Sequence, residues 1–211
     1  MKLLAVDTAL GACSVAILDG DNVMAHVFEA MERGHAEALA PMVETAMHDA
    51  RLDFAKLDRL AVTTGPGTFT GQRVGLAFMR GLRVALKRSL VGVTTLAAMG
   101  AQAMAETGLI AYAALHDARR GEVYLQTSGS EPAVLPFDDA LAEIARREGR
   151  FALAGTAAKG AAERLKNGVL SSVRQPDALW VARLAATMAD PGAPPRPLYL
   201  RAPDAKLPGT K

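Results

Sequence analysis

Two aspartates, Asp7 and Asp117, stand at matching points of a repeated pattern, and their carboxylates are the first candidates for chemistry. Each follows an apolar, strand-like run and is followed four residues later by a glycine, after which a second alternating run begins. A carboxylate at the tip of such a hairpin can hold a metal and nucleotide between two lobes, or it can cap its own turn. The pattern alone leaves both interpretations open.

A glycine-rich loop is the second candidate. The strand-like run 60–64 passes into Gly65, Pro66 and Gly67, and Gly71 lies at the start of a helix-patterned run. Glycines between a strand and a helix let the backbone approach a ligand or another part of the chain closely, and Pro66 stiffens the turn. No Gly-Lys-Ser/Thr follows, so the loop is not a Walker A motif. It is either a phosphate-binding loop or a tight turn.

The histidines and the single cysteine indicate no metal site. His35 and Glu37 are two residues apart, whereas two ligands on one helix face are three or four apart, so we interpret both as capping or solvated groups. The other histidines have no partner at metal spacing. Cys13 lies in a strand-like run and is interpreted as a small buried apolar side chain. The sequence predicts neither a metal nor an intrinsic cofactor.

The elements that position these residues follow from the period of the apolar side chains. A short apolar run at 3–6 and an alternating run at 13–18, followed by 23–28 and separated by Asp/Gly turns, predict three antiparallel strands. Helical spacing follows over 35–50, where Pro41 either kinks the helix or moves its start to Ala40. A helix over 72–87 is apolar on more than one face, which indicates burial on two sides, within the chain or against a partner. A strand at 91–95 and a helix at 96–105 complete this half.

The second half repeats the opening pattern. Two strands are predicted at 109–115 and 122–127, followed by a helix, a strand and a helix at 138–148, 151–154 and 159–166, with loops at 129–136 and 191–197. Because Asp7 and Asp117 are 110 residues apart in equivalent hairpins, the pattern predicts a duplicated α/β architecture. The predicted units are a first lobe at 1–105, a shorter second lobe at 106–190, and a tail at 191–211 that docks on the body.

Composition indicates a globular protein with a sizeable core. Half of the residues are apolar, and 24 basic against 22 acidic residues give a net charge of +2, too little for a strong field toward nucleic acid. The apolar run at the N-terminus is short and interrupted by Asp7, so it predicts no signal peptide and no membrane span. We expect a cytoplasmic protein.

With these motifs in place, the chain resembles the TsaB (YeaZ) family, bacterial subunits of tRNA threonylcarbamoyladenosine synthesis. The matching segments are residues 4–8, 33–37, 65–75, 93–98 and 199–201. The segment 65–75 is the most specific, and the last third of the chain is the least. The resemblance implies an actin-like (ASKHA, ribonuclease H-like) fold of two lobes, with mixed sheets and flanking helices.

The same resemblance implies that catalysis has been lost. The catalytic paralogue, TsaD, carries two metal-binding histidines just after the strand that follows the shared helix, and Thr95 and Met99 stand at those positions here. A hydroxyl and a thioether cannot replace two imidazoles on a metal. The family therefore implies a non-catalytic scaffold and activating subunit, and excludes the glycoprotein endopeptidase activity once assigned to such sequences.

Partners are implied by the family rather than by the composition. TsaB-like proteins pair with a TsaD-like catalytic subunit, a TsaE-like ATPase joins them, and the complex handles ATP and transfers threonylcarbamoyl to the tRNA adenosine beside the anticodon. The family interface uses the first two helices. We therefore predict a partner surface, and a weak homodimer in the partner's absence, involving Met42, Ala46, Phe78, Met79 and Leu82.

Two other functions stay open. The chain could be a small actin-like ATPase or kinase that binds nucleotide between Asp7 and Asp117, although the short second lobe offers only 155–160 as an adenosine site. In the scaffold interpretation the same cleft is vestigial and binds nucleotide weakly. Direct tRNA binding has little support in the net charge, but a basic run could extend a partner's tRNA surface: Arg80, Arg83, Lys87 and Arg88.

Overall fold

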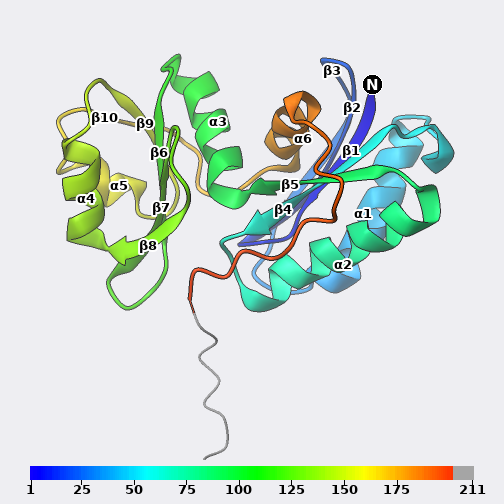
Figure 1. Cartoon of the computed structure of the whole chain (residues 1–211), viewed down its shortest axis with the longest axis horizontal. Coiled ribbons are helices and arrows are strands. Elements are labelled where there is room, and N and C mark those ends of the chain that lie inside the picture. Colours follow the sequence, from blue (N-terminus) through cyan, green and yellow to red (C-terminus); the bar gives the residue numbers. More distant parts are fainter. Residues whose placement is uncertain (202–211) are drawn as a thin grey trace, which may run out of the picture.

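The chain folds into two halves that repeat one order of elements (Figure 1). The computed structural model describes residues 1–201. The first half contains β1 (Lys2–Asp7), β2 (Ala12–Asp19), β3 (Asn22–Ala30), α1 (His35–Asp49), the 3-10 turn η1 (Phe54–Lys56), β4 (Arg59–Gly65), α2 (Phe69–Leu86), β5 (Ser89–Thr94) and α3 (Thr95–Thr107). The second contains β6 (Tyr112–Asp117), β7 (Glu122–Thr127), β8 (Ala133–Pro136), α4 (Phe137–Ala145), β9 (Phe151–Ala154), α5 (Ala158–Ala162), β10 (Gly168–Leu170) and α6 (Ala178–Thr187).

Each half is built on a mixed five-stranded sheet. The first sheet has the order β3-β2-β1-β4-β5 and the second the order β8-β7-β6-β9-β10. In both, the first strand pairs antiparallel with the second and parallel with the fourth, β1 with β2 and β4, and β6 with β7 and β9. The two sheets therefore share one topology, which confirms the duplicated α/β architecture expected from the repeated hairpin.

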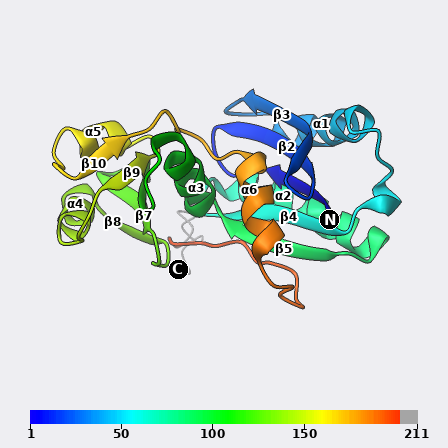
Figure 2. The same ribbon diagram turned by 90° about the horizontal axis from the view of Figure 1, so that it is seen from above.

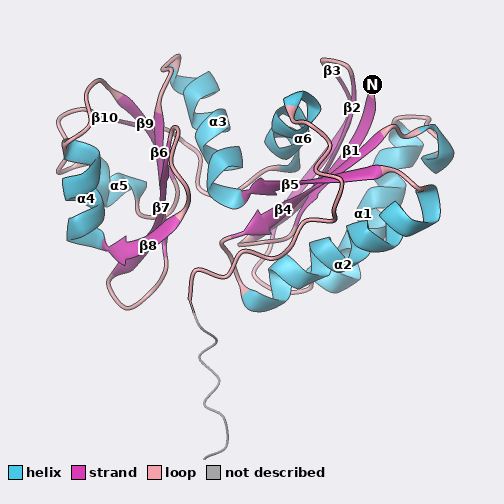
Figure 3. Cartoon of the chain, in the orientation of Figure 1, coloured by secondary structure: helices cyan, strands magenta, loops and turns pink. Residues whose placement is uncertain are grey.

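Helices cover both faces of each sheet (Figure 3). One face of the first sheet carries α1 and α2, and one face of the second carries α4 and α5. On its opposite face each sheet is covered by a helix from the other half of the chain. Helix α3 packs Leu96 and Met99 against the second sheet, and α6 packs Val181 and Ala182 against the first. Figure 2 shows α3 and α6 beside each other between the sheets.

This exchange departs from the predicted lobes at 1–105 and 106–190. The helix α6, which the sequence did not predict, belongs by its packing to the first sheet although it lies in the predicted second lobe. Its start is fixed by Asp177, whose carboxylate accepts a hydrogen bond from the Leu179 N–H at 2.8 Å and another from His26 of β3, also at 2.8 Å. The Ala178 N–H donates to the Ser14 hydroxyl of β2 at 2.8 Å. The side chains of Asp177, His26 and Ser14 thus hold α6 on the first sheet, although α6 follows the strands of the second sheet in the sequence.

Several element boundaries differ from the prediction. Helix α1 begins at His35 and includes Pro41, so the alternative start at Ala40 is wrong. The segment predicted as a loop at 129–136 contains the edge strand β8, which ends at Pro136, a position where a strand can lose a backbone N–H. Helix α2 begins at Phe69 rather than at 72, because the Thr68 hydroxyl caps it by accepting from the Gly71 N–H at 3.0 Å.

After α6 the chain runs as an extended segment along α2 and toward the second half (Figure 1). The Leu198 N–H donates to the Thr64 carbonyl at 2.8 Å, and Arg73 donates to the Tyr199 hydroxyl at 2.9 Å. Arg201 donates to the Ala118 carbonyl at 2.6 Å and pairs with Glu122 of β7. The rest of the predicted tail, 202–211, lies outside the described residues. Within residues 1–201, none of the helices has the length and apolar character to cross a membrane.

Candidate functional site

The carboxyl group of Asp7 lies buried at the end of β1 and not in the space between the halves. The Thr63 hydroxyl donates to its Oδ1 at 2.6 Å and the Ala9 N–H at 3.2 Å, while Oδ2 has no hydrogen-bond partner among the described residues. Burial raises the pKa of Asp7 to about 7, outweighing the two hydrogen bonds, which lower it. Asp7 is therefore inaccessible to a ligand in this structure.

The glycine-rich loop covers the hairpin that follows Asp7. The Thr68 N–H donates to the Ala9 carbonyl at 2.8 Å, and the Thr8 hydroxyl donates to the Gly71 carbonyl at 2.7 Å. A methyl group on Gly71 would lie 2.2 Å from the Thr8 oxygen, and one on Gly67 would lie 2.3 Å from the Ala9 oxygen. The glycines thus permit close contact between two parts of the chain, and the Thr68 N–H of the loop is already bonded to the hairpin.

The second hairpin is covered in the same way. A methyl group on Gly155, at the end of β9, would lie 2.0 Å from the Leu115 oxygen. The carboxylate of Asp117 accepts from the Arg119 N–H at 2.8 Å, and the Thr156 hydroxyl accepts from the Asp117 N–H at 2.9 Å. Arg119 and the next residue are left-handed, at φ 65° and 59°. Asp117 therefore caps its own turn, one of the two roles expected for it.

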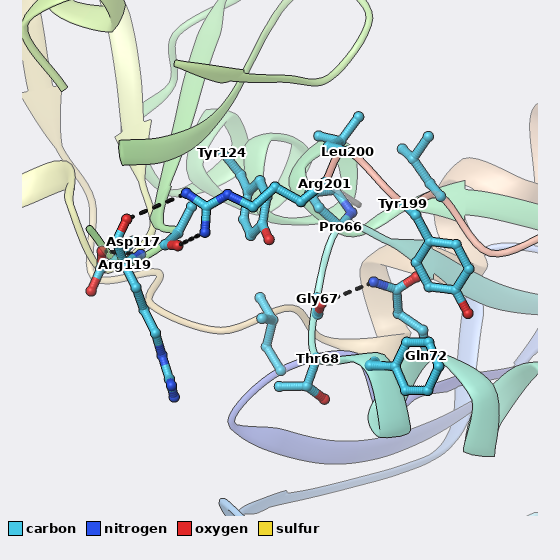
Figure 4. Close-up of a pocket in the computed structure, with 14 residues that line it drawn as sticks. Pro66, Gly67, Thr68, Gln72, Asp117, Arg119, Tyr124, Tyr199, Leu200 and Arg201 are labelled. Carbon is cyan, nitrogen blue, oxygen red and sulfur yellow. Dashed lines mark hydrogen bonds between the residues drawn. The ribbon is translucent and has the colours of Figure 1, made fainter. Parts of the chain in front are cut away.

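A cavity of about 350 Å³ lies between the halves (Figure 4). Asp117 and Arg119 reach it from the second half, and Tyr199 and Arg201 reach it from the extended segment. The first half contributes the start of α2 and the glycine-rich loop, through Pro66, Gly67, Thr68, Phe69 and Gln72. Of the two predicted aspartates, Asp117 lines this cavity and Asp7 does not.

Two features of the cavity were not expected from the sequence. Gln72 is buried, donates from Nε2 to the Gly67 carbonyl at 3.0 Å, and leaves Oε1 without a partner among residues 1–201. Phe69, Arg73 and Tyr199 form a stack in which the Arg73 guanidinium lies 3.5 Å from the Phe69 ring centre. The sequence predicted that the tail docks on the body, but not that it lines this cavity.

Several side chains for which the sequence predicts no catalytic or metal-binding role are buried in the structure. Thr95 and Met99 are fully buried, with Met99 in the core beneath the second sheet. His35 is buried and donates from Nε2 to the Leu10 carbonyl at 2.9 Å, which attaches α1 to the first hairpin. Cys13 is buried, and burial raises its thiol pKa to about 12. Within residues 1–201 the structure shows no group of three or more His, Cys, Asp or Glu side chains that could hold a metal.

The predicted partner surface needs correction. Met42, Ala46 and Met79 are buried in the chain's own core against the first sheet, so they have no surface to offer a second chain. Phe78 and Leu82 are only partly buried and stay predictions. The residues that α2 exposes in its C-terminal half are small or apolar: Ala77, Gly81, Val84 and Ala85. Helix α1 exposes Ala36, Ala40 and Pro41 beside polar side chains such as Glu37, Glu44 and His48.

Two mixed sheets of one topology, whose hairpins lie on opposite sides of a cleft, define an actin-like protein of two lobes. Comparisons with known proteins assign the family. The family model of TsaD, tRNA N6-adenosine threonylcarbamoyltransferase, matches residues 23–180. The solved structure of YeaZ from Pseudomonas aeruginosa is 30% identical and superposes with a TM-score of 0.78, covering 94% of this chain and 99% of that one. The chain belongs to the TsaB/YeaZ family, related to TsaD.

Two sequence relatives show how far the similarity extends. The tRNA threonylcarbamoyladenosine biosynthesis protein TsaB of Escherichia coli is 39% identical over 124 residues, which is 59% of this chain and 53% of that protein. The matched part thus spans about half of the Escherichia coli protein. The uncharacterized protein Rv3421c of Mycobacterium tuberculosis is 37% identical over 207 residues, covering 97% of this chain and 93% of that protein. These findings confirm the family and the actin-like fold expected from the sequence.

Proposed function

We propose that this chain is a non-catalytic subunit that pairs with a TsaD-like catalytic subunit in the transfer of threonylcarbamoyl to tRNA. The observation that carries the proposal is the exposed apolar surface of α2 from Ala77 to Val84. Val84 is 72% exposed, and Ala77 and Gly81 are exposed on the same helix. Small side chains allow two helices to approach closely, and an apolar face without cover favours a partner.

The pairing surface is centred on Ala77 and Gly81 of α2. Phe78 and Leu82 follow them in the sequence of α2 and also pack on the chain's own core. On α1 the exposed Ala36 and Ala40 continue the surface. An interface of two helices from each chain would bury the half-exposed apolar side chains that the single chain leaves in water.

Gly81→Arg should abolish pairing without harming the fold. A Cβ on Gly81 would meet nothing within 4 Å, so the long side chain projects freely into the space that a partner helix would occupy. Replacing a helical glycine should also stabilise the isolated chain by about 0.5–1 kcal/mol. We expect sedimentation velocity with the TsaD-like protein of the same organism to give a one-to-one complex for the native chain and none for the variant at tens of micromolar.

Ala142→Arg on α4 is the matched control, since Ala142 is exposed on a helix of the second half and its variant should pair normally. Sedimentation velocity of the chain without the partner tests for the weak homodimer, which we expect the native chain to form and the Gly81→Arg variant not to form. A native chain that forms no complex would contradict the proposed function. A complex that forms with the native chain and survives Gly81→Arg would contradict this placement of the interface.

Nucleotide and cofactor handling belong to the same proposal. Both hairpins are covered by their own chain, at Gly71 and Gly155, which disfavours a metal–nucleotide complex held by Asp7 and Asp117. We propose that ATP is handled by the cytoplasmic complex through a TsaE-like ATPase, that tRNA is bound within that complex, and that the cleft alone binds nucleotide weakly.

A further inference from the structure

A second cavity, of about 360 Å³, lies between the C-terminal half of α2 and the extended segment after α6. Figure 1 shows this segment beside α2. The described residues that line the cavity include three arginines and no carboxylate: Arg80, Arg83, Val84, Ala193, Pro194 and Arg196. We call this the arginine groove. Two elements far apart in the sequence thus bring three guanidinium groups to one hollow.

No described ion pair neutralises the charge of the arginine groove. None of the ion pairs described for residues 1–201 involves Arg80, Arg83 or Arg196. The sequence from 59 to 105 contains six basic residues and no aspartate or glutamate. The segment 191–201 contains no acidic residue either, and the carboxylate of Asp190, which precedes it, accepts a hydrogen bond from the Gly192 N–H at 3.0 Å. The net charge of +2 is therefore the sum of a locally basic surface and a more acidic remainder.

Arg80 also fixes the shape of the groove, because it connects the two elements that form it. Its guanidinium donates to the Pro195 carbonyl and so holds the extended segment beside α2. Its Nε is buried and has no partner among the described residues. The same side chain lines the groove, so the remaining N–H groups of its guanidinium can donate to an anion there.

We propose that the arginine groove binds phosphate groups of an RNA backbone. Guanidinium groups match phosphate oxygens in geometry and charge, and three of them close together repel one another until an anion enters. The basic side chains continue from Arg80 to Lys87, about 10 Å along the helix at 1.5 Å per residue. That length suits consecutive phosphates of one strand better than a single phosphate group.

The inference rests on the proposed function, because it assigns to this chain part of the tRNA contact that the complex must make. The groove adjoins the pairing surface through Val84, which lines it, and Gly81, one turn before. A tRNA bound to a partner seated on Gly81 could therefore extend onto Arg83 and Arg196. These side chains would position the backbone and would carry no sequence information.

Arg83→Ala with Arg196→Ala tests the inference without disturbing the fold, because no described hydrogen bond or ion pair involves either side chain. Arg146→Ala with Arg150→Ala is the matched control, with the same charge change on exposed positions of the second half. The probe is a fluorescent, unmodified tRNA transcript, titrated with the complex and with the full chain alone over a series of salt concentrations. Sedimentation of the same samples reports whether the complex has formed.

We expect the groove variant to bind the transcript about tenfold more weakly at 0.1 M salt, and the slope of log affinity against log salt to fall by about 1.5, as two lost phosphate contacts predict. The control should match the native protein. Unchanged affinity and slope in an intact complex would overturn the inference. So would a loss of ATP binding, titrated in parallel, with tRNA binding intact. If no complex forms, the proposed function fails, and the same comparison on the chain alone decides the groove.

Discussion

Gly71→Ala should lower the free energy of unfolding by about 3 kcal/mol or more, among the largest effects of any single methyl group in this protein. The added Cβ would lie 2.2 Å from the Thr8 carbonyl oxygen and 2.6 Å from the Thr68 hydroxyl. Neither can move without loss, because Thr68 caps α2 and Thr8 is bonded to the Gly71 carbonyl at 2.7 Å. Urea unfolding followed by circular dichroism measures the change.

Gly81→Ala is the matched control within the same helix. Its Cβ would meet nothing within 4 Å, so the substitution should stabilise the chain by about 0.5–1 kcal/mol. If the free energy of unfolding of Gly71→Ala in water lay within about 0.5 kcal/mol of the native value, the loop could not be packed on the hairpin as described. Such a result would reopen the loop as a ligand-binding element.

The fold was predictable where local pattern and packing agree. A short apolar run marks β1 and alternation marks β2, and the repeated Asp-x-x-x-Gly hairpin indicates the duplication that the two sheets display. The exchange of α3 and α6 could not be predicted, because an apolar stripe indicates that a helix is buried but not which sheet it covers. Which sheet it covers depends on tertiary contacts such as the bond between Asp177 and His26.

The candidate site was predictable only in part, for a related reason. Periodicity identified the apolar stripes of α1 and α2 but could not separate residues buried in the chain's own core, such as Ala46 and Met79, from residues left for a partner. The exposed positions carry small side chains, Ala77 and Gly81, which give little signal in a hydrophobic pattern. Likewise, identical spacing predicted the same role for Asp7 and Asp117, whereas Asp7 is buried and Asp117 is exposed beside the cavity.

Asp7→Asn should change the pH dependence of stability. The ordinary pKa of 3.8 holds in the unfolded chain, and burial raises it to about 7 in the folded one. Between these values the folded state keeps a proton that the unfolded state has lost, so native stability falls as pH rises. The cost at pH 8 is of the order of 4 kcal/mol, at about 1.4 kcal/mol per pKa unit. Asparagine removes it.

The variant should therefore gain stability relative to the native chain from pH 5 to pH 8, as measured by urea unfolding at each pH. The difference between pH values is the informative quantity, because any packing effect of the amide is the same at every pH. Asp117→Asn is the control: Asp117 is exposed and caps its own turn through the Arg119 N–H, a bond that asparagine can also accept. Parallel curves for Asp7→Asn and the native chain would mean that Asp7 is ionised and solvated. The expected divergence would instead describe a carboxyl group that is half protonated near pH 7 and closed off from the cleft, unsuited to holding a metal–nucleotide complex, which argues against the ATPase alternative.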